Sequence, residues 1–276
     1  MEFNQPPWVA EARSYAAGFC YDAHMLLPAV FFILGAIVAS FVGVLSGRLN
    51  TGQGFISGRS RCDACNAPLP TLALVPILSY IASCGRAQCC GARLSLRAPC
   101  TEILLGALFV LAYFNLGLTT AFPFFLFSLS TLLALVLYDL AHQILPSPLL
   151  VAFILTASVT ALLSAPSSAE FFGTLAIAFL IALSLALIHF LSRGRAMGLA
   201  DAPLAFGLAL LVGPAALSGF IFSFWIGALI GIALLLRRPA GSRMGVEVPF
   251  APFLAAGFLL AYFTQWNLFV FIAASR

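Results

Sequence analysis

The chain has 276 residues, of which 62% are hydrophobic and only 8% are charged. A soluble domain cannot bury so much apolar surface, and runs of about 20 apolar residues indicate helices that span a lipid bilayer. The formal net charge of +4 comes from thirteen basic residues, all of them arginine. Because these arginines lie between apolar runs, they indicate membrane topology and argue against nucleic acid as a partner. The sequence therefore predicts an all-α polytopic membrane protein.

The N-terminal segment, residues 1–25, carries no basic cluster. The run that follows, Leu26–Gly47, is long for the apolar core of a signal peptide and lacks a clear cleavage site. We therefore expect the first run to be a retained span and residues 1–25 to lie on its periplasmic side.

Apolar runs predict eight membrane helices. Three runs are too long for one span and contain breaks at 115–123, 164–168 and 213–219. Dividing the runs at these breaks gives helices at 26–47, 101–116, 122–138, 148–164, 171–191, 203–214, 219–236 and 251–273.

The arginines support the count of eight. With eight spans, one face of the membrane carries Arg48, Arg59, Arg61, Arg86, Arg93, Arg97, Arg193, Arg195, Arg237, Arg238 and Arg243. Only Arg13 and Arg276 lie opposite, and positive residues are enriched in cytoplasmic loops. The arginine-rich face is therefore predicted to be cytoplasmic. A single span at 203–236 would place Arg237 and Arg238 on the other face.

Two aspartates, Asp139 and Asp201, stand at the ends of apolar runs. A charged side chain inside a bilayer costs about 2.5–3.5 kcal/mol on insertion scales, so such carboxylates usually have a function. The eight-helix topology places both at the cytoplasmic boundary. There, two neighbouring carboxyls can hydrolyse a peptide, one taking a proton from water and the other donating to the carbonyl. The alternative is a helix cap, since aspartate is a good N-cap and Asp201 precedes an apolar run.

The predicted cytoplasmic stretch 48–100 holds six of the seven cysteines: Cys62, Cys65, Cys84, Cys89, Cys90 and Cys100. The cytosol is reducing, so clustered cysteines there suggest a metal site more than disulfides. Zinc prefers four Cys or His ligands, often from two C-x-x-C pairs. Cys62 and Cys65 form one such pair. The alternative is a degenerate loop with free thiols.

Several motifs in order resemble a known family. Met197–Asp201 resembles the G-x-G-D signature of intramembrane aspartyl proteases, and Tyr138–Pro146 is similar to the first aspartate motif of type IV prepilin peptidases. Further similar segments are Ser40–Phe41 with Arg48–Leu49, Ser60–Cys65, Gly85–Ser95 with Glu102, and Val248–Leu254. The chain thus resembles type IV prepilin peptidases along most of its length.

The resemblance implies a multi-pass protein of the bacterial inner membrane, with an active site that faces the cytoplasm. Asp139 and Asp201 would be the catalytic pair of an aspartic endopeptidase. Its substrates would be type IV prepilins or type II secretion pseudopilins, which lose a cytoplasmic leader. Residues 26–100 would be associated with N-methylation by S-adenosylmethionine and residues 101–276 with the peptidase. No nucleotide-binding motif supports the methyl transfer.

The resemblance also bears on the metal. The second cysteine pair of the family aligns with Ala87 and Cys90, and alanine cannot bind zinc. The expected zinc ligands are therefore Cys62, Cys65 and Cys90, with Cys89 as the fourth or Cys84 as its alternative.

Four positions depart from the family pattern. Ala200 replaces the second glycine of G-x-G-D and limits backbone freedom there. Pro203 stands where lysine is usual, Ala251 replaces a glycine, and Gly43 replaces an asparagine. The alternative functions are a catalytically impaired homologue or a small transporter that uses the aspartates as ion sites. Transport sites usually lie near the membrane midplane, which argues against the second.

Three further residues have open roles in the sequence. Glu102 stands at the entrance of a predicted helix, where it is either a cap or part of the cytoplasmic site. His142 follows Asp139 by three residues and is either a contact of the pair or a solvated side chain. His189 is predicted to pack between helices.

Overall fold

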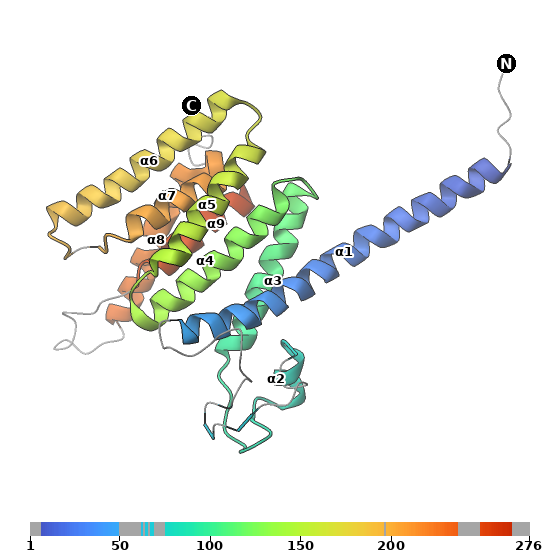
Figure 1. Ribbon diagram of the computed structural model, residues 1–276, viewed down its shortest axis with the longest axis horizontal. Coiled ribbons are helices and arrows are strands. Elements are labelled where there is room, and N and C mark those ends of the chain that lie inside the picture. The colour runs from blue at the N-terminus through green and yellow to red at the C-terminus, as the bar shows by residue number, and fades with distance from the viewer. Residues whose placement is uncertain are drawn as a thin grey trace. The chain divides into compact units, whose positions relative to one another are not determined.

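The structure is a computed structural model that describes residues 7–49, 62, 64–65, 67–68, 75–195, 197–236 and 249–266, with backbone alone for 7–25 and 235. Its elements are α1 Pro7–Arg48, α2 Leu78–Ala82, α3 Arg97–Leu116, α4 Phe122–His142, α5 Ser147–Ser164, α6 Ser168–Leu191, α7 Asp201–Val212, α8 Ala216–Leu236 and α9 Ala251–Thr264 (Figure 1). The expected all-α class is confirmed. The eight longer helices correspond one to one with the eight predicted from the apolar runs.

Several helix boundaries differ from the prediction; α4 ends at His142 instead of residue 138, and α6 and α8 each begin three residues earlier than predicted. Helix α1 begins at Pro7 instead of residue 26, because alanine-rich sequence favours a helix even where it is too polar to mark a span. Helix α3 begins at Arg97 instead of residue 101. Helix α9 ends at Thr264 instead of residue 273, since Gln265 takes a left-handed conformation with φ 53°. Residues 267–276 of that predicted helix lie outside the described residues.

Six segments of the described chain are long and apolar enough to cross a membrane: Leu26–Arg48, Arg97–Leu116, Phe122–His142, Ser147–Ser164, Ser168–Leu191 and Asp201–Leu234. The chain is therefore a multi-pass membrane protein. The last segment contains two helices, α7 and α8, separated by a 3-10 turn at Gly213–Ala215. With 12 and 14 residues, α7 and α9 are only about 18 and 21 Å long, shorter than the hydrocarbon core of about 30 Å.

Helix α8 returns beside α9 in the antiparallel direction. Gly219, near the start of α8, lies against Phe258, and Gly227 lies against Phe253. The Ser223 hydroxyl donates to the Leu254 carbonyl at 3.2 Å. Helix α8 therefore ends on the side where α9 begins. Gly213, in the turn between α7 and α8, has a φ of 59°. Arg237, Arg238 and Arg243, which would test the topology further, lie outside the described residues.

The chain divides into two compact units, one formed by residues 1–40 and 61–114 and the other by residues 41–60 and 115–276. In the first unit, α1 and α3 approach closely at two glycines. A Cβ on Gly35 would lie 2.8 Å from Gly106 Cα, so small residues are needed at this helix crossing.

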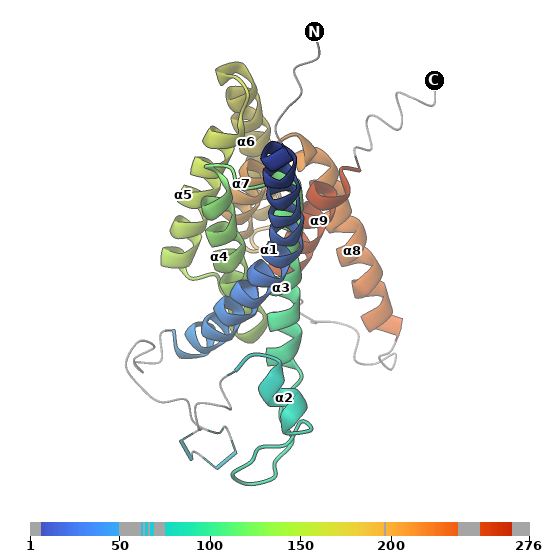
Figure 2. The ribbon, with the colours of Figure 1, turned by 90° about the vertical axis from the view of Figure 1, so that its right-hand side faces the viewer.

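The second unit surrounds α7. This helix is apolar on all sides, as expected of a helix with no exposed face, and ten of its twelve residues are buried. Helices α5, α6, α8 and α9 pack around α7 (Figure 2). Phe153 of α5 fills the space beside Gly207 of α7. Helix α7 therefore has a fixed position, and its first residue is Asp201.

Candidate active site and metal centre

Asp139 lies in the last turn of α4 and is 6% exposed. A negative charge near a helix C-terminus is unfavourable because the helix dipole is negative there. The helix ends instead through the left-handed conformation of Gln143, whose N–H donates to the Asp139 carbonyl at 2.8 Å. The Asp139 carboxyl is thus not needed to end the helix, and its burial there requires another explanation.

Asp201 is the first residue of α7 and is 7% exposed. Its carboxyl accepts a hydrogen bond from the backbone of Gly198. The position is electrostatically favourable, because the N-terminus of a helix carries partial positive charge. The residue thus begins the helix, although Ala200 and not Asp201 holds the N-cap position.

The structure brings the two aspartates together. Their carboxyls lie close enough to interact electrostatically. The Asp139 carboxyl also accepts a hydrogen bond from the backbone N–H of Ala251, the first residue of α9. The N-termini of α7 and α9 therefore meet at one carboxyl pair, and both stabilise negative charge there.

One oxygen of the pair has no hydrogen-bond partner. Within the described residues, Asp139 Oδ2 is buried and accepts no hydrogen bond. Leaving a buried carboxylate oxygen unpaired costs about 1–3 kcal/mol or more. A buried oxygen without a partner suits a site where a bound reactant donates the missing hydrogen bond. Asp139 Oδ2 is therefore suited to accept a proton from water.

The loop before Asp201 is held by His189 at the end of α6. The imidazole Nδ1 lies 2.8 Å from the Met197 carbonyl oxygen and donates to it. Sequence reasoning expected helix packing from His189, and the structure shows a hydrogen bond to the loop. Gly198 follows Met197, and a Cβ at Gly198 would lie 3.4 Å from Asp201 Oδ2. Glycine thus leaves free space beside the carboxyl.

The two departures beside Asp201 are compatible with the local backbone. Ala200 has φ −70° and ψ −16°, in the right-handed helical region. The expected limit on backbone freedom therefore has no effect, because this position does not use a conformation that only glycine adopts. Pro203 is the third residue of α7, in the first turn, where backbone N–H groups have no partner within the helix.

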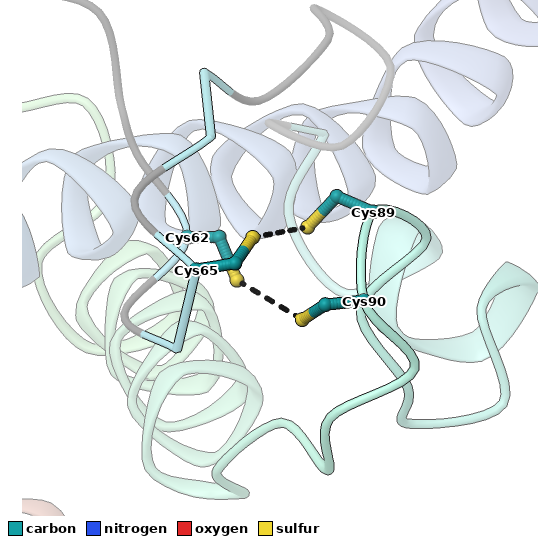
Figure 3. Close-up of side chains that lie close together, drawn as sticks. All are labelled: Cys62, Cys65, Cys89 and Cys90. Atoms are coloured by element: carbon teal, nitrogen blue, oxygen red, sulfur yellow. Dashed lines mark hydrogen bonds between the residues drawn. The ribbon is translucent and has the colours of Figure 1, made fainter.

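Four cysteine sulfurs lie together at the end of a loop pair in the first unit (Figure 3). Those of Cys62, Cys65, Cys89 and Cys90 all lie within 4.8 Å of one another. The Cys62 and Cys90 sulfurs are 3.8 Å apart and the Cys65 and Cys89 sulfurs 3.3 Å apart, too far for disulfides. Cys84 is not part of the cluster. The fourth position, left open between Cys89 and Cys84, is thus occupied by Cys89.

The backbone explains why Cys89 reaches the cluster. The Cys62 N–H donates to the Ala67 carbonyl, and the Ala87 N–H donates to the Ala92 carbonyl. The two turns therefore have the same hydrogen-bond spacing, with Ala87 in the place of Cys62 and Cys90 in the place of Cys65. Ala87 supplies no sulfur, and the Cys89 side chain reaches the same cluster from within the second turn.

The chemistry of the cluster suits zinc. Four thiolates placed tetrahedrally at about 2.3 Å from a zinc ion lie about 3.8 Å from one another, close to the spacing observed. Hydrogen bonds from the backbone of Cys65 and Ala64 lower the pKa of Cys62 from 9.0 to about 7. Zinc binds the thiolate and not the thiol, so these bonds favour the ligating form of Cys62. Hydrogen bonds with the Cys65 and Cys62 side chains raise the pKa of Cys89 to about 12, so Cys62 gives this support and Cys89 does not.

Glu102 and His142 have structural partners. Glu102 is the sixth residue of α3, not an N-terminal cap, and its buried Oε2 accepts the Ile77 N–H at 2.7 Å. Ile77 has φ 60°, which is rare for a β-branched residue. Glu102 therefore stabilises a strained turn before α2. The exposed His142 ring lies against Tyr138 of its own helix, with centroids 4.4 Å apart and a tilt of 42° between the rings.

Two family models match successive parts of the chain. Residues 33–116 match the family described as Bacterial Peptidase A24 N-terminal domain. Residues 126–236 match the Type IV leader peptidase family. No solved structure matches the chain.

Several curated proteins are similar over most of the chain, and each is named prepilin leader peptidase/N-methyltransferase. The protein from Bacillus subtilis (strain 168) is 32% identical over 237 residues, 84% of this chain and 92% of the relative. Those from Myxococcus xanthus and Dichelobacter nodosus are 33% and 34% identical over 79% and 72% of this chain, and over 66% and 69% of their own lengths. With family matches in both parts and a relative 32% identical over 84% of its length, this chain belongs to the type IV leader peptidase family.

Proposed function

We propose that this protein is a membrane aspartic endopeptidase that removes the leader from type IV prepilins or type II secretion pseudopilins. The observation that carries the proposal is the meeting of Asp139 and Asp201 at the N-termini of α7 and α9. Family membership supports the substrate class, since the similar proteins are named for prepilin processing.

The geometry supports acid–base hydrolysis with one proton on the pair. Ala251 holds one oxygen of Asp139, and the unpartnered Oδ2 takes a proton from water. The water oxygen attacks the carbonyl carbon while Asp201 donates its proton to the carbonyl oxygen. Asp139 then gives its proton to the amide nitrogen, Asp201 takes back a proton from a hydroxyl of the tetrahedral intermediate, and the C–N bond breaks. The products are the free leader carboxylate and a new N-terminal amine.

The structure argues against the two alternatives. Ala200 adopts a backbone conformation that its side chain allows, and Pro203 stands in the first turn of α7, so the local backbone gives no reason to expect an impaired enzyme. A transporter would use an ion site near the middle of the membrane. Asp139 and Asp201 instead stand at the last turn of one helix and the first residue of another.

The proposal is tested by adding a type IV prepilin precursor to the purified full-length protein in lipid nanodiscs. We expect one cut between leader and apolar segment, identified by mass spectrometry of both products. An intact precursor together with proton uptake into proteoliposomes would instead support the transporter.

The arginines support an orientation in the membrane. We propose that the aspartate pair faces the cytoplasm across the bacterial inner membrane, because the predicted loops at this end of the helices carry most of the arginines. The substrate leader would approach from the cytoplasm, and its apolar segment would stay in the bilayer.

N-methylation of the new N-terminus is proposed as a second activity. Its support is the match of residues 33–116 to the N-terminal family domain and the names of the similar proteins. The methyl donor would be S-adenosylmethionine, associated with residues 26–100. Transfer of a labelled methyl group to the cleaved pilin would confirm the activity, and an unlabelled product under the same conditions would refute it.

We also propose that Cys62, Cys65, Cys89 and Cys90 hold a structural zinc ion. When bound, zinc would tie together the two turns that carry these residues. All four positions of a tetrahedral site would be filled by sulfur, so no position remains for water or substrate.

The Ala251 N–H gives a test of the carboxyl environment. Ala251→Pro removes this donor. Ala251→Val adds similar bulk at the same buried site and keeps the donor. Phe250 before this position lies in the right-handed helical region (φ −92°, ψ −25°), which a following proline disfavours, so thermal unfolding of the two variants must match. A hydrogen bond to a charged group contributes about 1.5–3 kcal/mol, so we expect the proline variant to cleave roughly ten- to a hundredfold more slowly than the valine variant. Equal rates would show that the bond does not support catalysis.

A further inference from the structure

We propose that an apolar groove beside Asp201 binds the apolar segment of the substrate that follows the scissile bond. The groove has a volume of about 670 Å³ and is lined by residues of α5, α6, the start of α7 and the loops that precede α5 and α7. We call it the α6–α7 groove. The inference rests on the proposed function and adds to it a location for the substrate.

The groove adjoins the aspartate pair. Ala200 and Ala202, the residues on either side of Asp201, both line it. Asp201 itself does not line the groove, so a segment seated there would end beside the backbone at Asp201. Pro203 lines the groove as well, so two of the positions that depart from the family pattern shape this surface.

The face of α6 is continuous along the groove. Phe179, Ala182, Leu183 and Ala186 line it at helical spacing, one row along α6. Because Ala182 and Ala186 have small side chains, the helix surface is lower at these two positions than at Phe179 and Leu183. Phe179 and Leu183 are 59% and 50% exposed on a helix long enough to cross the membrane, so the groove opens toward the bilayer.

The chemistry of the lining selects an apolar occupant. Ser147 is the only polar side chain among the lining residues, and none is charged. An apolar segment seated in the groove would contact apolar side chains along nearly all of it, whereas a charged segment would find no partner of opposite charge. The apolar segment after the cleavage point therefore suits the groove, and the leader would lie on another side of the aspartate pair.

The size agrees with a helical segment. One turn of an α-helix with its side chains is 10–12 Å wide and 5.4 Å long, which corresponds to roughly 400–600 Å³. The groove of about 670 Å³ therefore takes about one turn. The apolar segment of the substrate would stay in the bilayer while bound. Packing against small residues would stabilise it there, as it does helix pairs in lipid.

Photocrosslinking in nanodiscs tests the groove. p-Benzoylphenylalanine is placed at Leu183, which lines it, or at Leu180, which is on the same helix, does not line it and is 62% exposed. Both proteins carry Asp139→Asn, so that a prepilin precursor with its leader is bound without being cut. We expect at least tenfold more crosslinked precursor from position 183, joined to the apolar segment. Equal yields, products with lipid alone or crosslinks to the leader would overturn the proposal.

A filled groove gives an independent measurement. Ala186→Trp places bulk within the groove, and Leu187→Trp places it on a neighbouring exposed position. We expect Ala186→Trp to raise KM at least tenfold with kcat within a few-fold, and Leu187→Trp to change neither. Unchanged KM in Ala186→Trp would count against the groove.

The unaltered enzyme is assayed for cleavage of the same precursor in parallel. Cleavage without crosslinks at position 183 would refute the groove and leave the peptidase intact. Absence of cleavage with specific crosslinks would refute the peptidase and leave the groove. Each proposal can thus fail by itself.

Discussion

Replacement of either aspartate by asparagine is expected to lower the rate of prepilin cleavage by roughly a thousandfold. Asparagine has nearly the same shape as aspartate, but it neither takes a proton from water nor donates one as a carboxyl does. Acid–base catalysis by a positioned group contributes about 10²–10⁴-fold, and each variant removes one of the two groups. The measurement is the initial rate of leader release by Asp139→Asn and Asp201→Asn in nanodiscs.

Glu170→Gln provides the matched control for these variants. Glu170 lies in the first turn of α6, at the opposite end of this helix from His189 and the loop to Asp201. The substitution makes the same chemical change without touching the aspartate pair, so it should leave the rate unchanged. Thermal unfolding of all three variants must resemble that of the unaltered protein. Near-normal cleavage by either aspartate variant would contradict the assignment.

Loss of the metal is the second large expected effect. Cys62→Ser removes one of four sulfurs that lie within 4.8 Å of one another. We expect bound zinc to fall from about one equivalent per chain to nearly none, as measured by elemental analysis of the purified protein. Structural zinc contributes about 10–16 kcal/mol to small domains that fold with it. The turns around the cluster should therefore become sensitive to proteolysis.

Cys84→Ser is the control for the metal prediction. Cys84 belongs to the same loop region but lies outside the four-sulfur cluster, so its loss should leave the zinc content unchanged. Cys89→Ser should behave like Cys62→Ser. Zinc retained in Cys89→Ser and lost in Cys84→Ser would show that the ligand set is wrong, and iron in place of zinc would correct the identity of the metal.

The helices could be predicted from the sequence because apolar runs and their breaks report the membrane directly. The break at 213–219 was found from Gly213 and Pro214, and the structure has its turn there. The start of α1 and the end of α9 could not be found in this way. Hydropathy marks where a chain is apolar, whereas a helix continues wherever the backbone geometry allows.

The aspartates were predicted to lie at one face, but their contact could not be predicted. It depends on the packing of α7 inside the second unit, which is a property of the whole helical bundle. The role of Ala251 could not be predicted from its side chain, because the hydrogen bond to Asp139 is donated by the backbone N–H. The prolines at 249 and 252 and the similarity of 248–254 to the family pattern marked the segment without showing its role.

For the cysteines, too, one part of the site could be predicted from the sequence and another could not. Spacing identified Cys62 and Cys65 as a pair, whereas the resemblance to the family added Cys90 and left the fourth sulfur open between Cys84 and Cys89. The choice depends on the backbone of the second turn, where the Ala87 N–H donates to Ala92 at 2.8 Å. Sequence spacing alone does not reveal that this turn repeats the hydrogen bonding of the first.

The central claim is that Asp139 and Asp201 act as one catalytic unit. Single-turnover cleavage by the two single asparagine variants and by the double variant tests this claim most directly. Residues that act together are strongly non-additive, so we predict that the double variant cleaves within about threefold of the slower single variant. A double variant slower by the product of the two single losses would show independent roles, and a single variant within tenfold of the unaltered enzyme would contradict the paired mechanism.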